Sequence, residues 1–164
     1  MSEAHHRRWR LLSVLGISLG IVVGLSGCGS SPSTARAVGP SYEITTAREG
    51  GLGTILVDGK GFTLYLFVPD DHSSHSRCTG ICAAAWPPLT LPKGVSLPVA
   101  GPGVRSSLLG VTVRSDGSRQ VTYNGWPLYT YVIDMAPGQT TGQGLNNLGG
   151  LWYVVAPRGT AVRS

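Results

Sequence analysis

Two ten-residue stretches decide the fold: GFTLYLFVPD at positions 61–70 and GWPLYTYVID at positions 125–134. They align without gaps at an offset of 64 residues, and each reads Gly-aromatic-x-Leu-Tyr-x-aromatic-x-x-Asp. Successive side chains of a strand point to opposite faces, so the Tyr and the second aromatic residue share one face. Each stretch is apolar on both faces, which is typical of a strand buried between two layers. The repetition predicts a duplicated β unit with pseudo-two-fold symmetry.

The sequence on either side of these stretches also favours strands. The sequence predicts tight turns at 58–61, 116–117 and 124–125. Each contains glycine, which accepts the positive φ of a tight hairpin. No segment keeps a 3.6-residue apolar period over three turns. We predict an all-β fold, a compact duplicated β unit of sandwich or barrel type, with at most one short helix, at 83–85. The expected strands are 42–46, 54–57, 62–68, 111–114, 120–123, 126–133 and 151–156, with 160–162 at a sheet edge.

The N-terminal segment has the pattern of an export signal. Three arginines precede an apolar run over 11–25, which suits a signal-peptide core and is short for a membrane-spanning helix. The run ends at Leu25-Ser26-Gly27-Cys28, which resembles the lipobox of bacterial lipoproteins. That resemblance implies that Cys28 is acylated, with palmitate as one expected chain, and becomes the mature N-terminus. We therefore expect a lipoprotein on the extracytoplasmic face of the cell membrane, since two or more acyl chains anchor a domain stably.

These features divide the chain into three parts. Residues 1–27 are the expected signal peptide, 28–41 the lipidated cysteine and a flexible tether rich in Pro, Gly and Ser, and 42–164 a single β domain. The domain contains two repeats, at about 53–100 and 110–164. The formal charge of the whole chain is +5, and removal of the signal leaves ten basic and seven acidic residues. The scattered arginines argue against nucleic acid as a partner.

The two cysteines left after lipidation are Cys78 and Cys82. An even pair in an exported chain indicates a disulfide first, with a turn at Thr79-Gly80 that would bring the sulfurs together. A redox pair and a metal site are the alternatives. Covalent haem attachment is excluded, because Ala83 stands where that motif has a histidine.

The repeats carry a family resemblance. The sequence resembles bacterial secreted lipoproteins with a Tyr-x-(Phe/Trp/Tyr)-x-x-Asp motif, a repeat family of unknown function. The motif positions are Tyr65, Phe67 and Asp70, and then Tyr129, Tyr131 and Asp134. Further resemblance lies in 78–89 and 137–153, which include Trp86 and Trp152, whereas 71–75 departs from the family pattern. The resemblance covers nearly the whole mature domain and implies no particular chemistry.

Two roles are open for the motif carboxylates. Asp70 and Asp134 fall where a strand should end, so each is expected to accept backbone N–H bonds that fix a turn. In the other role, two Tyr–Asp pairs line one cleft and bind a cation, a sugar hydroxyl or a peptide amine. The aromatic residues of the motifs, with Trp86 and Trp152, are then candidate ligand-binding positions.

The histidines of the mature chain are His72 and His75. With the preceding carboxylates they are a candidate zinc or copper site, although a serine-rich loop of this kind is also an ordinary solvated connection.

Three functions are compatible with this sequence. The expected mature chain, residues 28–164, contains no Gly-x-Ser-x-Gly elbow. We therefore expect a non-enzymatic binding or scaffold module whose partner is an envelope protein or a cell-wall ligand. The second is a metal- or haem-handling, electron-transfer lipoprotein, with the motif tyrosines, the two histidines and Met135 as non-covalent ligands. The third is an envelope hydrolase that depends on Asp70 and Asp134. No cofactor is predicted for the first.

Overall fold

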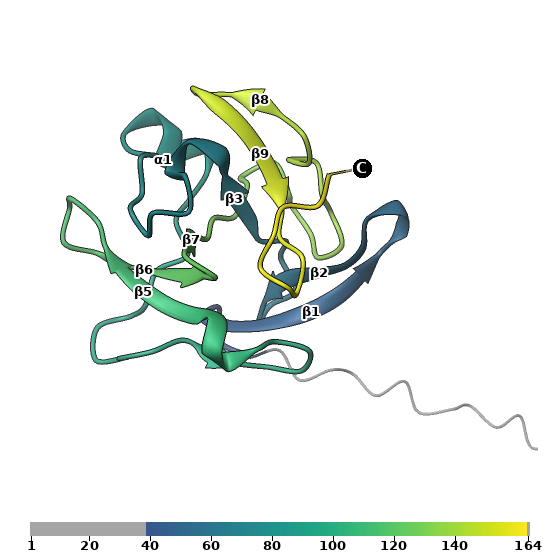
Figure 1. Ribbon diagram of the computed structural model, residues 1–164, viewed down its shortest axis with the longest axis horizontal. Coiled ribbons are helices and arrows are strands. Elements are labelled where there is room, and N and C mark those ends of the chain that lie inside the picture. The colour runs from purple at the N-terminus through teal and green to yellow at the C-terminus, as the bar shows by residue number, and fades with distance from the viewer. Residues whose placement is uncertain (1–38, 164) are drawn as a thin grey trace, which may run out of the picture. The chain divides into compact units, whose positions relative to one another are not determined.

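A computed structural model describes residues 39–163 (Figure 1). The predicted signal peptide, the lipobox and most of the tether lie outside the described residues. In the described part of the chain, short strands alternate with turns. Residues 39–163 contain one α-helix, α1 (Ile81–Ala85), and 3-10 turns at Gly50–Leu52, Val68–Asp70 and Ser106–Leu108. The strands are β1 (Glu43–Glu49), β2 (Gly53–Asp58), β3 (Tyr65–Phe67), β4 (Val99–Ala100), β5 (Leu109–Val113), β6 (Arg119–Tyr123), β7 (Trp126–Pro127), β8 (Asn146–Asn147) and β9 (Gly150–Val154).

The strands form three small sheets, with the orders β2-β1-β4, β3-β9-β8 and β5-β6-β7. All pairs are antiparallel except β1 with β4. Backbone hydrogen bonds outside the strand ladders link the sheets: Leu64 N donates to Leu56 O, and Leu56 N donates to Val155 O. Equivalent bonds run from Leu128 N to Val121 O and from Val121 N to Leu89 O in the second half. The predicted all-β duplicated unit is confirmed.

The two motif strands meet at the centre of the duplication. Tyr65 N donates to Tyr129 O at 2.8 Å, and Tyr129 N donates to Tyr65 O at 3.0 Å. Such a reciprocal pair of bonds between equivalent residues is what a two-fold axis running between them produces. The two repeats are therefore joined backbone to backbone at their motif tyrosines.

Each motif strand separates two clusters of buried side chains. One cluster contains Leu64, Leu66 and Leu128. The other contains Tyr65, Phe67, Tyr129, Trp86 and Trp152. The alternation follows from the two-residue period of a strand. Both faces of these strands are buried, as their apolar sequence predicts.

The structure differs from the sequence prediction in several elements. Of the expected strand 62–68, β3 covers only Tyr65–Phe67, and the short strands β4 and β8 were not predicted. The expected strand over 126–133 is β7 followed by isolated bridges at Tyr129, because its neighbour runs through Pro87 and Pro88, which have no N–H to donate. The helix is longer than predicted. The hairpin of β1 and β2, joined through 50–52, was not predicted as a unit. The edge segment 160–162 is confirmed by a bridge between Val155 and Ala161.

Candidate functional site

The tyrosine of each motif is bonded to the aspartate of the other motif. Tyr65 Oη donates to Asp134 Oδ2 at 2.6 Å, and Tyr129 Oη donates to Asp70 Oδ2 at 2.7 Å. All four residues are buried. A hydrogen bond to a carboxylate is shorter and stronger than one between neutral groups. The tyrosine and the aspartate of one motif are therefore not bonded to each other. The Tyr–Asp pairs form only when the two repeats come together.

The second oxygen of each carboxylate closes a loop. Asp70 Oδ1 accepts Arg77 N at 2.7 Å, and Asp134 Oδ1 accepts Thr141 N at 3.0 Å. In both repeats the donor lies seven residues beyond the aspartate. Each aspartate thus holds its own loop with one oxygen and the opposite repeat with the other, which is the turn-fixing role with an added cross-link.

The surroundings of the two pairs are not equal. Tyr129 Oη also lies 2.8 Å from Ser76 Oγ, and Ser76 in turn accepts a bond from the Arg114 guanidinium. Arg114 is buried and also donates to Gln120 Oε1 and Cys78 O, each at 2.7 Å. At the other pair, Tyr65 Oη accepts Gly142 N at 3.2 Å.

Burial and the neighbouring carboxylates decide the ionisation of the pairs. Burial, reinforced by Asp134, raises the pKa of Tyr65 far above its ordinary value of 10.0, and burial with the charge of Asp70 does the same for the pKa of Tyr129. Burial also raises the pKa of Asp70 from 3.8, against the opposing effect of the bonds from Arg77 N and Tyr129. Both phenols therefore keep their protons, and can act as donors, at pH values at which an ordinary tyrosine has begun to ionise.

The remaining motif aromatics form a stack across the pseudo-two-fold axis. Trp86 and Trp152 are parallel with ring centroids 3.9 Å apart. Phe67 stacks on the outer side of Trp152 at 4.2 Å, and Tyr131 stacks on the outer side of Trp86 at 4.0 Å. We call these four rings the aromatic column. Tyr65 meets Trp86 and Tyr129 meets Trp152 in T-shaped contacts, with centroids 5.3 and 5.1 Å apart.

The column and the pairs are core structure. The tyrosines of the pairs, Asp70 and the two tryptophans have no exposed surface, and Phe67 and Asp134 have almost none. Tyr131, at one end of the column, is half-buried. The predicted cleft lined by both Tyr–Asp pairs is therefore filled by the protein itself, and Tyr131 is the motif ring that reaches the surface.

This arrangement of two motif copies agrees with a comparison at family level. A family model described as a secreted repeat of unknown function matches residues 46–90 and again residues 110–156. The chain belongs to this family. No curated protein and no solved structure matches the chain. The family is one of secreted proteins, so this is an extracytoplasmic protein, and none of the helices within residues 39–163 is long and apolar enough to span a membrane.

The predicted disulfide of this family member is present. Cys78 and Cys82 are bonded, with α-carbons 5.2 Å apart, and Gly80 supplies a φ of 56° in the turn between them. The bond lies directly after the loop that Asp70 closes, and both sulfurs pack against the cluster that contains Trp86. The disulfide therefore fixes the chain on its way from the Tyr–Asp pair to the aromatic column.

The two histidines of the loop lie apart from these groups. The His72 ring meets the Trp126 ring edge-on at 5.2 Å, and His75 Nδ1 lies 2.8 Å from Ser73 O. Within the described part of the chain, no three His, Cys, Asp or Glu side chains come close enough together to hold one metal ion.

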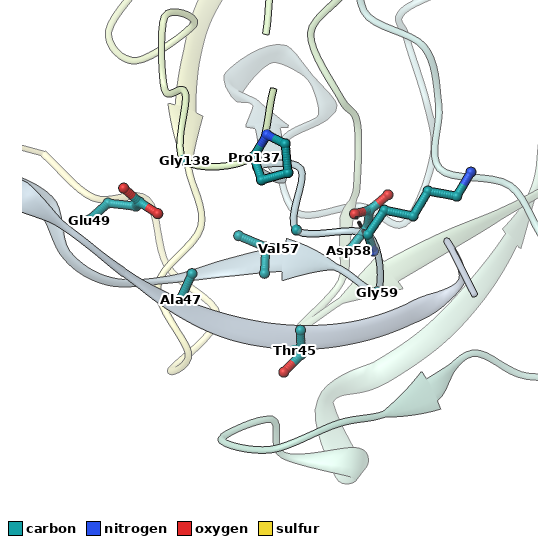
Figure 2. A pocket seen from close by; sticks show the side chains of 10 residues that line it. Thr45, Ala47, Glu49, Val57, Asp58, Gly59, Pro137 and Gly138 are labelled. Carbon is teal, nitrogen blue, oxygen red and sulfur yellow. Dashed lines mark hydrogen bonds between the residues drawn. The ribbon is translucent and has the colours of Figure 1, made fainter. Parts of the chain in front are cut away.

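Two hollows flank the turn at 58–61. The first, about 160 Å³, lies between the β1–β2 hairpin and Pro137-Gly138, with Glu49 and Asp58 toward opposite ends (Figure 2). The second, about 250 Å³, is lined by Tyr131 and by its neighbours Thr130, Val132 and Asp134. Asp58 and Lys60 line both hollows. Asp58 is buried, and its Oδ1 accepts hydrogen bonds from Lys60 N and Phe62 N.

Sequence reasoning did not identify Arg114, Ser76 or Gly142 as parts of the site. The repeat contained one usable signal: Trp86 follows Tyr65 by 21 residues, and Trp152 follows Tyr129 by 23. Equivalent placement in two related halves predicts equivalent positions about the axis. The burial of Arg114 has no such signal, because it depends on the loop that Asp70 closes.

Proposed function

We propose that this protein is a lipid-anchored binding module of the cell envelope, and that it binds an envelope protein or a cell-wall ligand beside Tyr131. The observation that carries the proposal is a run of exposed apolar side chains next to the second hollow. Val132 is 44% exposed, Ile133 55% and Met135 79%. Exposed apolar side chains that lie together on a surface, with polar residues around them, are a common feature of interaction sites.

The segment that carries these side chains is held in place from both ends. Val132 N donates to Ala85 O, and Asp134 is fixed by Tyr65 and by Thr141. Tyr131, which precedes it, stacks on a fully buried tryptophan. A surface ordered before binding loses less conformational entropy when a partner arrives, so more of the contact energy appears as affinity.

The anchor rests on the sequence. The lipobox-like Leu25-Ser26-Gly27-Cys28 and the tether that follows would keep the domain at the outer face of the membrane. The test is detergent phase partition of the exported protein. Wild type should enter the detergent phase and Cys28→Ser the aqueous phase. Equal partition of the two proteins would contradict acylation of Cys28.

The binding surface is tested by photo-crosslinking in intact cells. A photoreactive residue at Ile133 should give a discrete adduct, which a second change, Met135→Glu, abolishes. Val113 is a matched control, because it is an apolar β5 residue that is 67% exposed and neither it nor its chain neighbours line the second hollow, whereas Ile133 directly follows Val132, which does. Co-sedimentation of the purified domain with cell-wall material tests the other ligand class. Absence of both an Ile133-specific adduct and sedimentation would refute the binding role.

A further inference from the structure

The aromatic column links the surface to the buried Tyr–Asp pairs without a break. From Tyr131 inward, each ring is in van der Waals contact with the next, at centroid distances of 4.0, 3.9 and 4.2 Å. Each tryptophan also makes a T-shaped contact with a motif tyrosine. Core packing alone does not require that four stacked rings end at the surface, nor that both flanking phenols be bonded to carboxylates.

We propose that three rings of the aromatic column form a one-electron relay, which moves an oxidising equivalent from Tyr131 through Trp86 and Trp152 to the two carboxylate-bonded tyrosines. Tryptophan and tyrosine are the side chains most readily oxidised by one electron, and close contact between their rings favours electron transfer. The partner implied is a one-electron oxidant, an oxidising radical or a high-potential metal complex, that reaches the half-buried ring of Tyr131.

The step at the end of the relay balances in electrons and protons. The oxidant accepts one electron that originates at the phenol of Tyr65, passed outward ring by ring. At the same time the phenol proton moves along the 2.6 Å hydrogen bond to Asp134 Oδ2. The products are a neutral tyrosyl radical, a protonated Asp134 and the reduced oxidant. Tyr129 and Asp70 are arranged for the same step over 2.7 Å. Return of one electron from a reductant and of the proton to the phenolate restores the pair.

The carboxylates make the inner tyrosines the end of the path. An oxidised phenol is a strong acid, so a bonded base that takes its proton stabilises the neutral radical. Tyr123 offers the contrast within the same domain. It is also fully buried, but its hydroxyl donates to Pro157 O. A backbone carbonyl is too weak a base to take the proton of the phenol. This relay is separate from ligand binding, and either can fail without the other.

The experiment is flash photolysis of the purified exported protein with photogenerated ruthenium(III) tris-bipyridine and persulfate as the final electron acceptor. In wild type a tryptophanyl radical should appear first and decay as a neutral tyrosyl radical grows. The growth should be first-order, independent of protein concentration and slower in D2O, because a proton moves with the electron. Growth that scales with protein concentration, or no conversion of tryptophanyl to tyrosyl radical, would overturn the proposal.

Variants then locate the radical. Tyr65→Phe with Tyr129→Phe should lose the slow tyrosyl phase, and Tyr123→Phe should leave it unchanged. Trp126→Phe is the matched tryptophan control, since Trp126 packs on His72 outside the column. Should the double variant not fold, Asp134→Asn and Asp70→Asn, measured singly, replace it: each should diminish the phase and its isotope effect. A tyrosyl phase that persists in the folded double variant, or that both Asn variants leave intact, would refute the assignment.

Discussion

The exchanged Tyr–Asp pairs predict a specific pattern of energetic coupling. In a double-mutant cycle, Tyr65→Phe should couple to Asp134→Asn of the other repeat and not to Asp70→Asn of its own. The reason is that Tyr65 Oη donates to Asp134 Oδ2, whereas Asp70 bonds Tyr129. The motif spacing taken alone would favour the opposite pattern.

The magnitude follows from the bonds that each change removes. Tyr65→Phe deletes one buried hydrogen bond to a carboxylate, worth roughly 1.5–3 kcal/mol, and leaves Gly142 N without its acceptor, at about 1 kcal/mol. We expect the free energy of unfolding to fall by about 2–4 kcal/mol in the single variant. The coupling with Asp134→Asn should be about 1.5–3 kcal/mol, and that with Asp70→Asn within about 0.5 kcal/mol, as for side chains that share no bond.

The assay is equilibrium urea unfolding with the disulfide intact, and tryptophan fluorescence monitors the transition. The stacked pair Trp86–Trp152 lies in the same buried cluster as Tyr65, so the signal reports loss of this core. Tyr123→Phe serves as a control for removing a buried phenol. Coupling to Asp70 as large as coupling to Asp134 would show that the pairs are not exchanged between the repeats.

Three further outcomes follow from the same contacts. The unfolded chain loses phenol protons near pH 10 while the folded Tyr–Asp pairs keep theirs, so the free energy of unfolding should fall as pH rises above about 10. In a pH titration, two tyrosines should gain tyrosinate absorbance only as the protein unfolds. Titration of these two tyrosines in the folded state would contradict this. Cys78→Ser with Cys82→Ser should cost about 2 kcal/mol in urea unfolding and leave the domain folded; loss of folding would mean that the bond does more than close a short loop. Gly142→Ala should cost about 1–3 kcal/mol, because its Cβ would lie 2.6 Å from the buried Trp86 ring, whereas Gly51→Ala meets no atom and should be neutral; equal stability of the two variants would refute this packing.

The strands and the duplication could be predicted from the sequence because they depend on local patterns. The two-residue alternation around Tyr65 and Tyr129 assigns each side chain to a face, and the structure places Leu64 and Tyr65 in different clusters accordingly. The disulfide was predictable for a similar reason, since four residues separate its ends. Where prolines replace N–H donors beside Tyr129, the same local reading predicted a continuous strand that the structure breaks into single bridges.

The site could not be predicted in this way, because its bonds connect residues far apart in the sequence. Tyr65 and Asp134 are 69 residues apart, and nothing in either motif states which aspartate each tyrosine meets. The sequence led to two roles for the aspartates, turn fixing or ligand contact. The structure shows that one oxygen fixes a loop and the other joins the repeats, a combination that neither role alone contains.

The exchange of partners also bears on how the domain unfolds. If either repeat opened alone, Asp70 or Asp134 would lose the phenol of the other repeat, and one face of the Trp86–Trp152 stack would meet water. A buried carboxylate without its donor and an exposed tryptophan face each cost several kcal/mol by order of magnitude, so a half-open state is strongly disfavoured. We therefore expect one cooperative transition, with fluorescence and amide-exchange protection in both repeats lost together. Protection that survives in one repeat after the other has exchanged would show that the halves are stable separately, and that the exchanged pairs contribute little to joining them.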